Sequence, residues 1–186
     1  MNSRARHCLK CGTPLRPAVE DGQRRRRCPR CGWIFYDNPA PATAAIVSGP
    51  RGILLARRAR PPYADTWDLP GGFLESGEAP DRGLLRELRE ELGAAATITR
   101  LTGIYCDHYG PGGFPILTLA YLVRLRGSAR ARSDVSEIRW FPRGALPWGS
   151  IAFPSLRRAL RDYLTGRASG IGGRRPASPR RVRASQ

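Results

Sequence analysis

Residues 72–94 read GFLESGEAPDRGLLRELREELGA, and this stretch carries the most informative pattern in the chain. Glycine, glutamate and arginine recur in it with the fixed spacing G-x5-E-x7-R-E-U-x-E-E-x-G-U, where U is an apolar residue. Pro80 suits the first turn of a helix, where a missing N–H breaks no hydrogen bond, and Gly93 suits the position just past a helix end. The stretch therefore predicts a helix from about residue 80 to residue 92.

The predicted helix has an apolar face and an acidic face. Glu87, Glu90 and Glu91 stand at i, i+3 and i+4, so they share one side of the helix. Three neighbouring carboxylates repel one another, and such hard oxygen ligands suit Mg2+ or Mn2+. A solvated face of charged residues is the alternative, but the fixed glycine, glutamate and arginine partners favour a metal site. Four leucines form the apolar stripe: Leu84, Leu85, Leu88 and Leu92.

The residues around the acidic face support the same chemistry. Arg86 could pair with Glu78 and brace the helix against the preceding loop. Gly71 and Gly72 let the backbone approach a metal or a phosphate closely, because glycine has no Cβ. Metals held there would bridge phosphate oxygens and lower the pKa of a bound water. We therefore expect a divalent-metal site that acts on phosphate groups.

The spacing of residues 72–94, hereafter called the box, resembles that of the Nudix hydrolases. The resemblance implies an α+β fold, an α/β/α sandwich around a mixed sheet. It also implies that Glu87 and Glu91, with Glu90 close behind, bind the metals, and that a box glutamate or an outside acid is the general base. Glu137, in SEIRWFP, is similar to a downstream acid that some relatives use near the metals. A salt-bridge residue at a strand end is an equal interpretation of Glu137.

Residues 1–36 carry a second metal-binding pattern. Cys8 and Cys11 form one C-x2-C pair, and Cys28 and Cys31 form another, with 16 residues between the pairs. This spacing is typical of a structural Zn2+ held by four thiolates, and we expect a small zinc ribbon here. A disulfide framework is the rival interpretation, but nothing marks the chain as secreted. The fifth cysteine, Cys106, is expected to be a buried strand residue.

We expect the catalytic domain to span residues 37–165 and a disordered basic tail to span 166–186, where nothing is available to bury. A proline-rich hinge at 36–41 should bar helix and ordinary sheet. Residues 43–49 and 52–59 predict an antiparallel hairpin that turns near Gly49 and Pro50. Further strands are expected at 97–109, 115–126 and about 136–141, and a helix follows from Ser155 to Leu164.

The formal charge is +17, and most of the excess lies at the two ends of the chain. Residues 1–36 hold nine Lys or Arg and two acids, and residues 166–186 hold six Arg and no acid. Such segments can bind nucleic acid through phosphates. Lys10 is the only lysine, however, so the arginine bias could reflect a GC-rich genome, and no aromatic residue interleaves the tail. We therefore do not expect a nucleic-acid partner.

No run of 18 apolar residues and no apolar signal segment occur, so we expect a cytoplasmic protein without a membrane partner. The zinc ribbon is shared with NADH pyrophosphatases, but their SQPWPFPxSLM-like segment is missing from residues 98–122. Compact zinc-ribbon relatives resemble the chain more closely, through Y-x-NP at Tyr36, W-x-LPGGF at Trp67 and PW…AFPSL from Pro147. That group is related to ADP-ribose and FAD pyrophosphatases. The resemblance implies cleavage of a nucleoside-diphosphate derivative into two monophosphates.

Side chains near the box could contact that substrate. Arg57 and Arg58 could reach phosphates from a strand end, but neighbouring strand residues point to opposite faces, so at most one should enter the site, and we favour Arg57 as that residue. Four aromatic residues could stack on a base, although core packing is the alternative for most of them: Tyr105, Tyr109, Trp148 and Phe153.

Other functions remain open from sequence. The chain could be an NADH pyrophosphatase or hydrolyse modified nucleoside triphosphates. A ligand-sensing or nucleic-acid-binding regulator is a third interpretation, which the intact Arg86 and glutamates disfavour. The ribbon could pack on the catalytic domain, build a homodimer or bind a partner.

Overall fold

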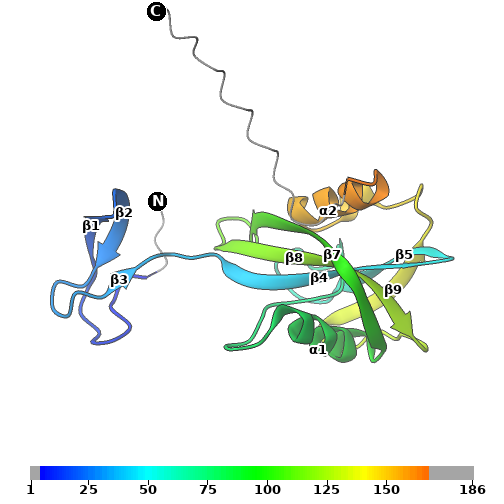
Figure 1. Cartoon of the computed structure of the whole chain (residues 1–186), viewed down its shortest axis with the longest axis horizontal. Helices are drawn as coiled ribbons and strands as arrows, with labels where there is room; N and C mark the ends of the chain where they lie inside the picture. The colour runs from blue at the N-terminus through cyan, green and yellow to red at the C-terminus, as the bar shows by residue number, and fades with distance from the viewer. Residues whose placement is uncertain (1–4, 168–186) are drawn as a thin grey trace, which may run out of the picture.

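The computed structural model describes residues 5–167, which form a small three-stranded sheet, a six-stranded sheet and two α-helices (Figure 1). The predicted tail therefore lies outside the described residues beyond Arg167. The small sheet consists of β1 (Arg16–Glu20), β2 (Gln23–Arg27) and β3 (Ile34–Phe35), all antiparallel. Its apolar interior is made by Cys8, Leu15 and Cys28. So small a core needs a further staple, such as a structural metal.

The large sheet has the order β6-β5-β4-β8-β7, and β9 pairs with β5. Its strands are β4 (Ala40–Gly49), β5 (Gly52–Arg58), β6 (Trp67–Asp68), β7 (Ala95–His108), β8 (Pro115–Arg126) and β9 (Val135–Phe141). Strands β4 and β8 are parallel, whereas the other pairs are antiparallel. The sheet is therefore mixed, as the resemblance implied, and the β4–β5 hairpin turns between Gly49 and Gly52 as expected.

Helices cover both faces of this sheet. Alternate residues of β4 point to opposite sides: Ile46 packs in the cluster under α2 (Pro154–Leu164), and Val47 packs in the cluster under α1 (Pro80–Leu92). A 3-10 turn, Trp148–Ser150, precedes α2. The α/β/α sandwich is thus confirmed (Figure 1). The helix predicted at 80–92 is also confirmed, with Gly93 in the left-handed region at φ 60°.

Two expectations are corrected by the structure. Strand β4 begins at Ala40 rather than at residue 43 and includes Pro41, which pairs with Leu117 of β8. The hinge is therefore shorter than predicted, because a parallel neighbour extends the sheet toward the ribbon. Cys106 lies on β7 as expected, but its side chain is exposed. In the described part of the chain, no helix is both long and apolar enough to cross a membrane.

Candidate active site

The loop before α1 is held against the first half of β4. The N–H of Ala45 donates to the carbonyl of Pro70 at 2.7 Å, and the N–H of Thr43 donates to the carbonyl of Gly72 at 2.8 Å. Further along, the N–H of Leu74 donates to the carbonyl of Pro41 at 3.1 Å. These backbone bonds fix the glycine pair between the centre of the sheet and the acidic face of α1.

Each glycine of the pair meets one glutamate of the helix. The Gly71 N–H donates to Glu91 Oε2 at 2.9 Å. A Cβ on Gly72 would lie only 2.5 Å from Oε1 of Glu87, so the Glu87 carboxylate occupies the space that a side chain would need. Gly71 has φ 142°, a backbone conformation that favours glycine. The two glycines therefore allow the backbone to lie directly against two carboxylates.

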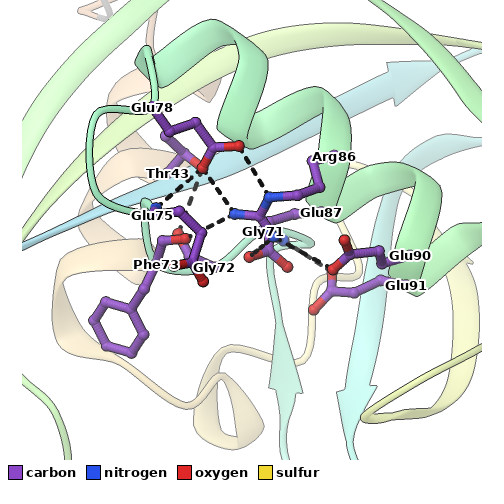
Figure 2. A network of polar contacts seen from close by, with 10 residues as sticks. All are labelled: Thr43, Gly71, Gly72, Phe73, Glu75, Glu78, Arg86, Glu87, Glu90 and Glu91. Carbon is purple, nitrogen blue, oxygen red and sulfur yellow. Dashed lines mark hydrogen bonds and ion pairs between the residues drawn. The ribbon is translucent and has the colours of Figure 1, made fainter.

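Arg86 ties the loop to the helix (Figure 2). Its guanidinium donates to both carboxylate oxygens of Glu78 at 2.9 Å and to the Phe73 carbonyl at 3.1 Å. It also donates to Glu87 at 2.9 Å and to Glu90 at 3.3 Å. Hydrogen bonds from Arg86 and from the Glu75 N–H lower the pKa of Glu78 to about 2. The expected pairing of Arg86 with Glu78 is thus present, and it also orients two of the acidic residues.

The three box glutamates differ in their surroundings. Glu91 is 7% exposed, and burial raises its pKa well above the usual range. Burial also raises the pKa of Glu87, against the opposing effect of Arg86. Glu90 keeps 51% of its side chain exposed. All three lie on the side of α1 that faces the glycine loop (Figure 2).

These residues offer hard oxygen donors whose buried negative charge only partly meets a positive partner. That donor set fits a divalent cation of the Mg2+ type. Within residues 5–167, only the four cysteines bring three or more candidate ligand atoms within 4.8 Å of one another. The candidate ligand atoms of the glutamates are therefore spread more widely than those of the cysteines.

A cavity of about 470 Å3 opens beside the glycine loop. Glu87 and Glu91 line it, together with Asp68 and Asp134, which sequence reasoning did not single out. Asp68 belongs to the run Trp67–Pro70 that leads into the box, and Asp134 precedes β9. Neither acid belongs to a periodic pattern in the sequence, and only the fold brings the two to the cavity.

Arg58 enters this cavity, whereas Arg57 does not line it. Nη1 of Arg58 contacts Asp68 Oδ2 at 2.7 Å, and Nη2 donates to the Tyr109 hydroxyl at 3.3 Å. Burial raises the pKa of Asp68 to about 6, although the ion pair with Arg58 opposes this shift. The expectation that only one of the two arginines points into the site is met, with Arg58 in place of the favoured Arg57.

Arg57 and Glu137 lie together outside the cavity. They are opposite each other in the β5–β9 register, and their side chains approach to 3.6 Å. Arg57 also approaches Asp65 at 3.6 Å, and Arg139 contacts Glu137 at 2.6 Å. This placement favours the salt-bridge interpretation of Glu137 over a position beside the metals.

Aromatic rings form another wall of the cavity. Phe73, Tyr109 and Phe153 line it. Tyr109 is stacked with Phe153 at a centroid distance of 5.8 Å and meets Phe73 edge-on at 5.1 Å. Tyr105 instead packs under α2, where its hydroxyl donates to Asp162 at 3.1 Å. Trp148 packs against the core cluster under α2. Two of the four expected aromatic residues therefore face the cavity.

The four ribbon cysteines lie together as the spacing predicted. Cys8 Sγ is 3.5 Å from Cys31 Sγ, and Cys11 Sγ is 3.5 Å from Cys28 Sγ. All four are free thiols, which excludes the disulfide framework. A tetrahedral Zn2+ with Zn–S bonds of about 2.3 Å places sulfurs about 3.8 Å apart. The cluster therefore fits a structural zinc ion.

Comparison with known proteins agrees with this geometry. The NUDIX domain family matches residues 38–162, and a zinc-ribbon family described as Nudix N-terminal matches residues 6–37. The crystal structure of a NUDIX hydrolase from Nitrosomonas europaea superposes with a TM-score of 0.75 at 29% identity, covering 89% of this chain and 94% of that one.

Two curated relatives carry functional names. The NAD-capped RNA hydrolase NudC of Deinococcus radiodurans is 34% identical over 170 residues, covering 88% of this chain but only 58% of the relative. The ADP-ribose pyrophosphatase of Methanocaldococcus jannaschii is 32% identical over 133 residues, covering 71% of this chain and 77% of the relative. Both the family matches and these identities lead to one conclusion: the chain belongs to the Nudix hydrolase family and carries the zinc-ribbon segment ahead of its Nudix domain.

Proposed function

We propose that this chain hydrolyses the diphosphate of a nucleoside-diphosphate derivative of the ADP-ribose or FAD type and releases two monophosphates. The observation that carries the proposal is the composition of the cavity. One part holds acidic side chains next to the glycine loop, and another part holds aromatic rings and Arg58. A substrate with a charged diphosphate and a flat base needs both environments.

The acidic part suits the diphosphate. Glu87 and Glu91, with Glu90 at the rim, would hold Mg2+ or Mn2+, which neutralises phosphate charge and lowers the pKa of a bound water. The Gly71 N–H restrains Glu91 by a hydrogen bond, and Arg86 restrains Glu87. In this scheme Arg86 is a positioning residue, and the general base is a box glutamate or an outside acid.

Asp134 is the candidate for that outside acid. It lines the cavity, whereas Glu137 is paired with Arg57 and Arg139 outside it. Since a base must reach the attacking water, a carboxylate inside the cavity is favoured.

The aromatic part of the cavity suits the heterocyclic base of a nucleotide. The ring of Tyr109, held by the hydroxyl contact with Arg58, offers a stacking surface beside Phe73. Base stacking on an aromatic ring tolerates different bases, so this wall fits adenine without demanding it. The identity shared with the M. jannaschii ADP-ribose pyrophosphatase supports ADP-ribose as the first substrate to test.

Cleavage of an NAD-type diphosphate is the second candidate function. It is favoured by the identity to NudC of D. radiodurans, which extends over 88% of this chain and includes the ribbon. The absence of the SQPWPFPxSLM-like segment favours ADP-ribose over this alternative.

Product analysis separates these functions. Purified protein is incubated with ADP-ribose, FAD, NADH, NAD-capped RNA or nucleoside triphosphates, with Mg2+ or Mn2+, and the products are resolved by ion-pair chromatography. We expect ADP-ribose to yield AMP and ribose 5-phosphate. Turnover of triphosphates alone, with release of pyrophosphate, would contradict the proposal.

A further inference from the structure

The ribbon carries a concentrated positive charge that its structural role does not require. Strand β2 reads Gln23–Arg27 and contains four consecutive arginines. Between residues 5 and 36 the only acids are Glu20 and Asp21. Neither β1 nor β2 pairs with the large sheet, and the ribbon lies beyond the N-terminal end of β4 (Figure 1). The charge is therefore presented to solvent rather than to the catalytic domain.

The strand register divides these arginines between two faces. Arg16 of β1 is directly opposite Arg27 of β2, so their side chains share a face. Arg24 and Arg26 alternate with Arg25 and Arg27 and point to the other face. Arg16 and Arg27 line a groove of about 360 Å3, which Pro17, Ala18 and Pro29 also line. Arg27 contacts Glu20 at 3.1 Å, yet 54% of its side chain stays exposed.

An exposed aromatic ring accompanies the arginines. Tyr36 is 45% exposed at the end of the ribbon, and the guanidinium of Arg25 lies over its ring at 5.3 Å. Arg25 also donates to the Tyr36 carbonyl at 2.6 Å, which fixes the pair. From sequence, nucleic acid was not expected because the arginine bias is open to a compositional explanation and because no aromatic residue lies in the tail. The folded ribbon, by contrast, places the exposed ring of Tyr36 beside its arginines.

We propose that the ribbon binds single-stranded nucleic acid on the face where Arg16 and Arg27 line the groove and Arg25, which shares that face of β2 with Arg27, holds Tyr36. Arginines in a groove contact successive phosphates, and an exposed ring stacks on a base of any identity. Bases in a duplex are already stacked and unavailable to Tyr36, and a lipid surface offers no base at all. The proposal concerns binding and does not depend on which diphosphate the cavity hydrolyses.

Fluorescence anisotropy with a labelled oligouridylate tests this inference on the full-length, zinc-loaded protein. The double variant Arg16→Gln, Arg27→Gln removes two phosphate contacts. Since each contact contributes a slope of about 0.7 in log K against log salt for single strands, the slope should fall by about 1.4. If the contacts add little at 1 M salt, the affinity at about 0.1 M salt falls roughly 25-fold. The matched control is Arg24→Gln, Arg26→Gln, which removes the same charge from the opposite face and should retain most of the affinity.

Tyr36→Ala supplies an independent measurement. It should weaken oligouridylate binding at least about fivefold, the equivalent of one lost stacking contact, but leave the affinity for inorganic polyphosphate unchanged. Zinc content and melting temperature verify that each variant is folded; if the Arg16, Arg27 variant loses zinc, Arg16→Gln alone replaces it, with half the change in slope. Any of three results would overturn the proposal. The two double variants could lose the same affinity for oligouridylate, Tyr36→Ala could lose the same affinity for polyphosphate as for oligouridylate, or the unmodified protein could bind anionic vesicles in preference to oligouridylate.

Discussion

Replacing Gly72 by alanine should disable the site while leaving the fold intact. The new Cβ would lie 2.5 Å from Oε1 of Glu87 and 2.8 Å from Oε2. Gly72 does not have a positive φ, so the backbone accepts alanine without strain. The conflict is therefore confined to the end of one side chain, which can move.

The size of that movement follows from the contact distances. Ordinary van der Waals contact begins at 3.4 Å, so the Glu87 carboxylate must retreat by at least about 0.9 Å. A displacement of about 1 Å in a catalytic group can cost about 100-fold in rate. We therefore expect Gly72→Ala to lower kcat about 100-fold, with a change in unfolding free energy below about 1 kcal/mol.

Gly71→Ala is the matched control because it places the same methyl group one residue earlier. Gly71 has φ 142°, and its Cβ would overlap the backbone carbonyl of Thr43, which cannot move without disturbing β4. That variant should lose about 1–3 kcal/mol of stability from the backbone conformation alone, and its Tm should fall by about 2–4 °C per kcal/mol.

Two measurements on both variants test whether Gly72→Ala acts by displacing the Glu87 carboxylate. Steady-state hydrolysis of the substrate found by product analysis gives kcat, and thermal unfolding gives Tm. If Gly72→Ala keeps wild-type kcat, the position of the Glu87 carboxylate does not govern turnover. If instead Gly72→Ala unfolds as readily as Gly71→Ala, the loss of activity is structural and does not arise from displacement of the Glu87 carboxylate.

Other predictions concern the remaining parts of the molecule. Glu91→Gln should cut kcat by about 100-fold or more, yet raise Tm of the metal-free protein, because it removes a buried charge; a fall in both would indicate a structural role. Because the pKa of Glu78 is about 2 when folded, below its ordinary value of 4.5, its ion pair stabilises the fold above pH 4.5 and this contribution is lost as pH falls toward 2. Arg86→Met should abolish that part of the pH dependence in urea unfolding, and an unchanged pH profile would contradict the assignment. Cys28→Ser should release zinc and unfold the ribbon alone, as measured by zinc content and by hydrogen exchange; retained zinc would contradict the four-thiolate site.

The sequence predicted those features whose physical cause lies in adjacent residues. Pro80 and Gly93 mark the ends of α1, and both ends are where the sequence placed them. The cysteine spacing predicted the thiol cluster, because two tight turns are enough to bring four sulfurs together. By contrast, the exposure of Cys106 could not be read from its strand pattern: it follows Tyr105, which packs under α2, and so points to the opposite face of β7, where it is exposed.

The cavity was harder to predict because it depends on contacts between distant segments. Arg57 and Arg58 are indistinguishable by composition, and only the pleat of β5 sends Arg58 toward Asp68 and Arg57 toward Glu137. Likewise, Asp134 reaches the cavity because the chain enters β9 beside β5. The spacing of residues along the sequence therefore does not predict a role that strand register sets.

Burial and electrostatics together explain why the box glutamates differ in character. If all three were as exposed as Glu90, a cation would gain little by binding them, because water already solvates their charge. Glu91 is withdrawn from water and retains one backbone N–H donor, so its charge is destabilised until a positive partner arrives. Arg86 cannot be that partner, because its donors are committed to Glu78, Glu87, Glu90 and the Phe73 carbonyl. Arg86 is thus bound to the loop and does not pair with Glu91, which leaves at the cavity a carboxyl group whose charged form a divalent cation can stabilise.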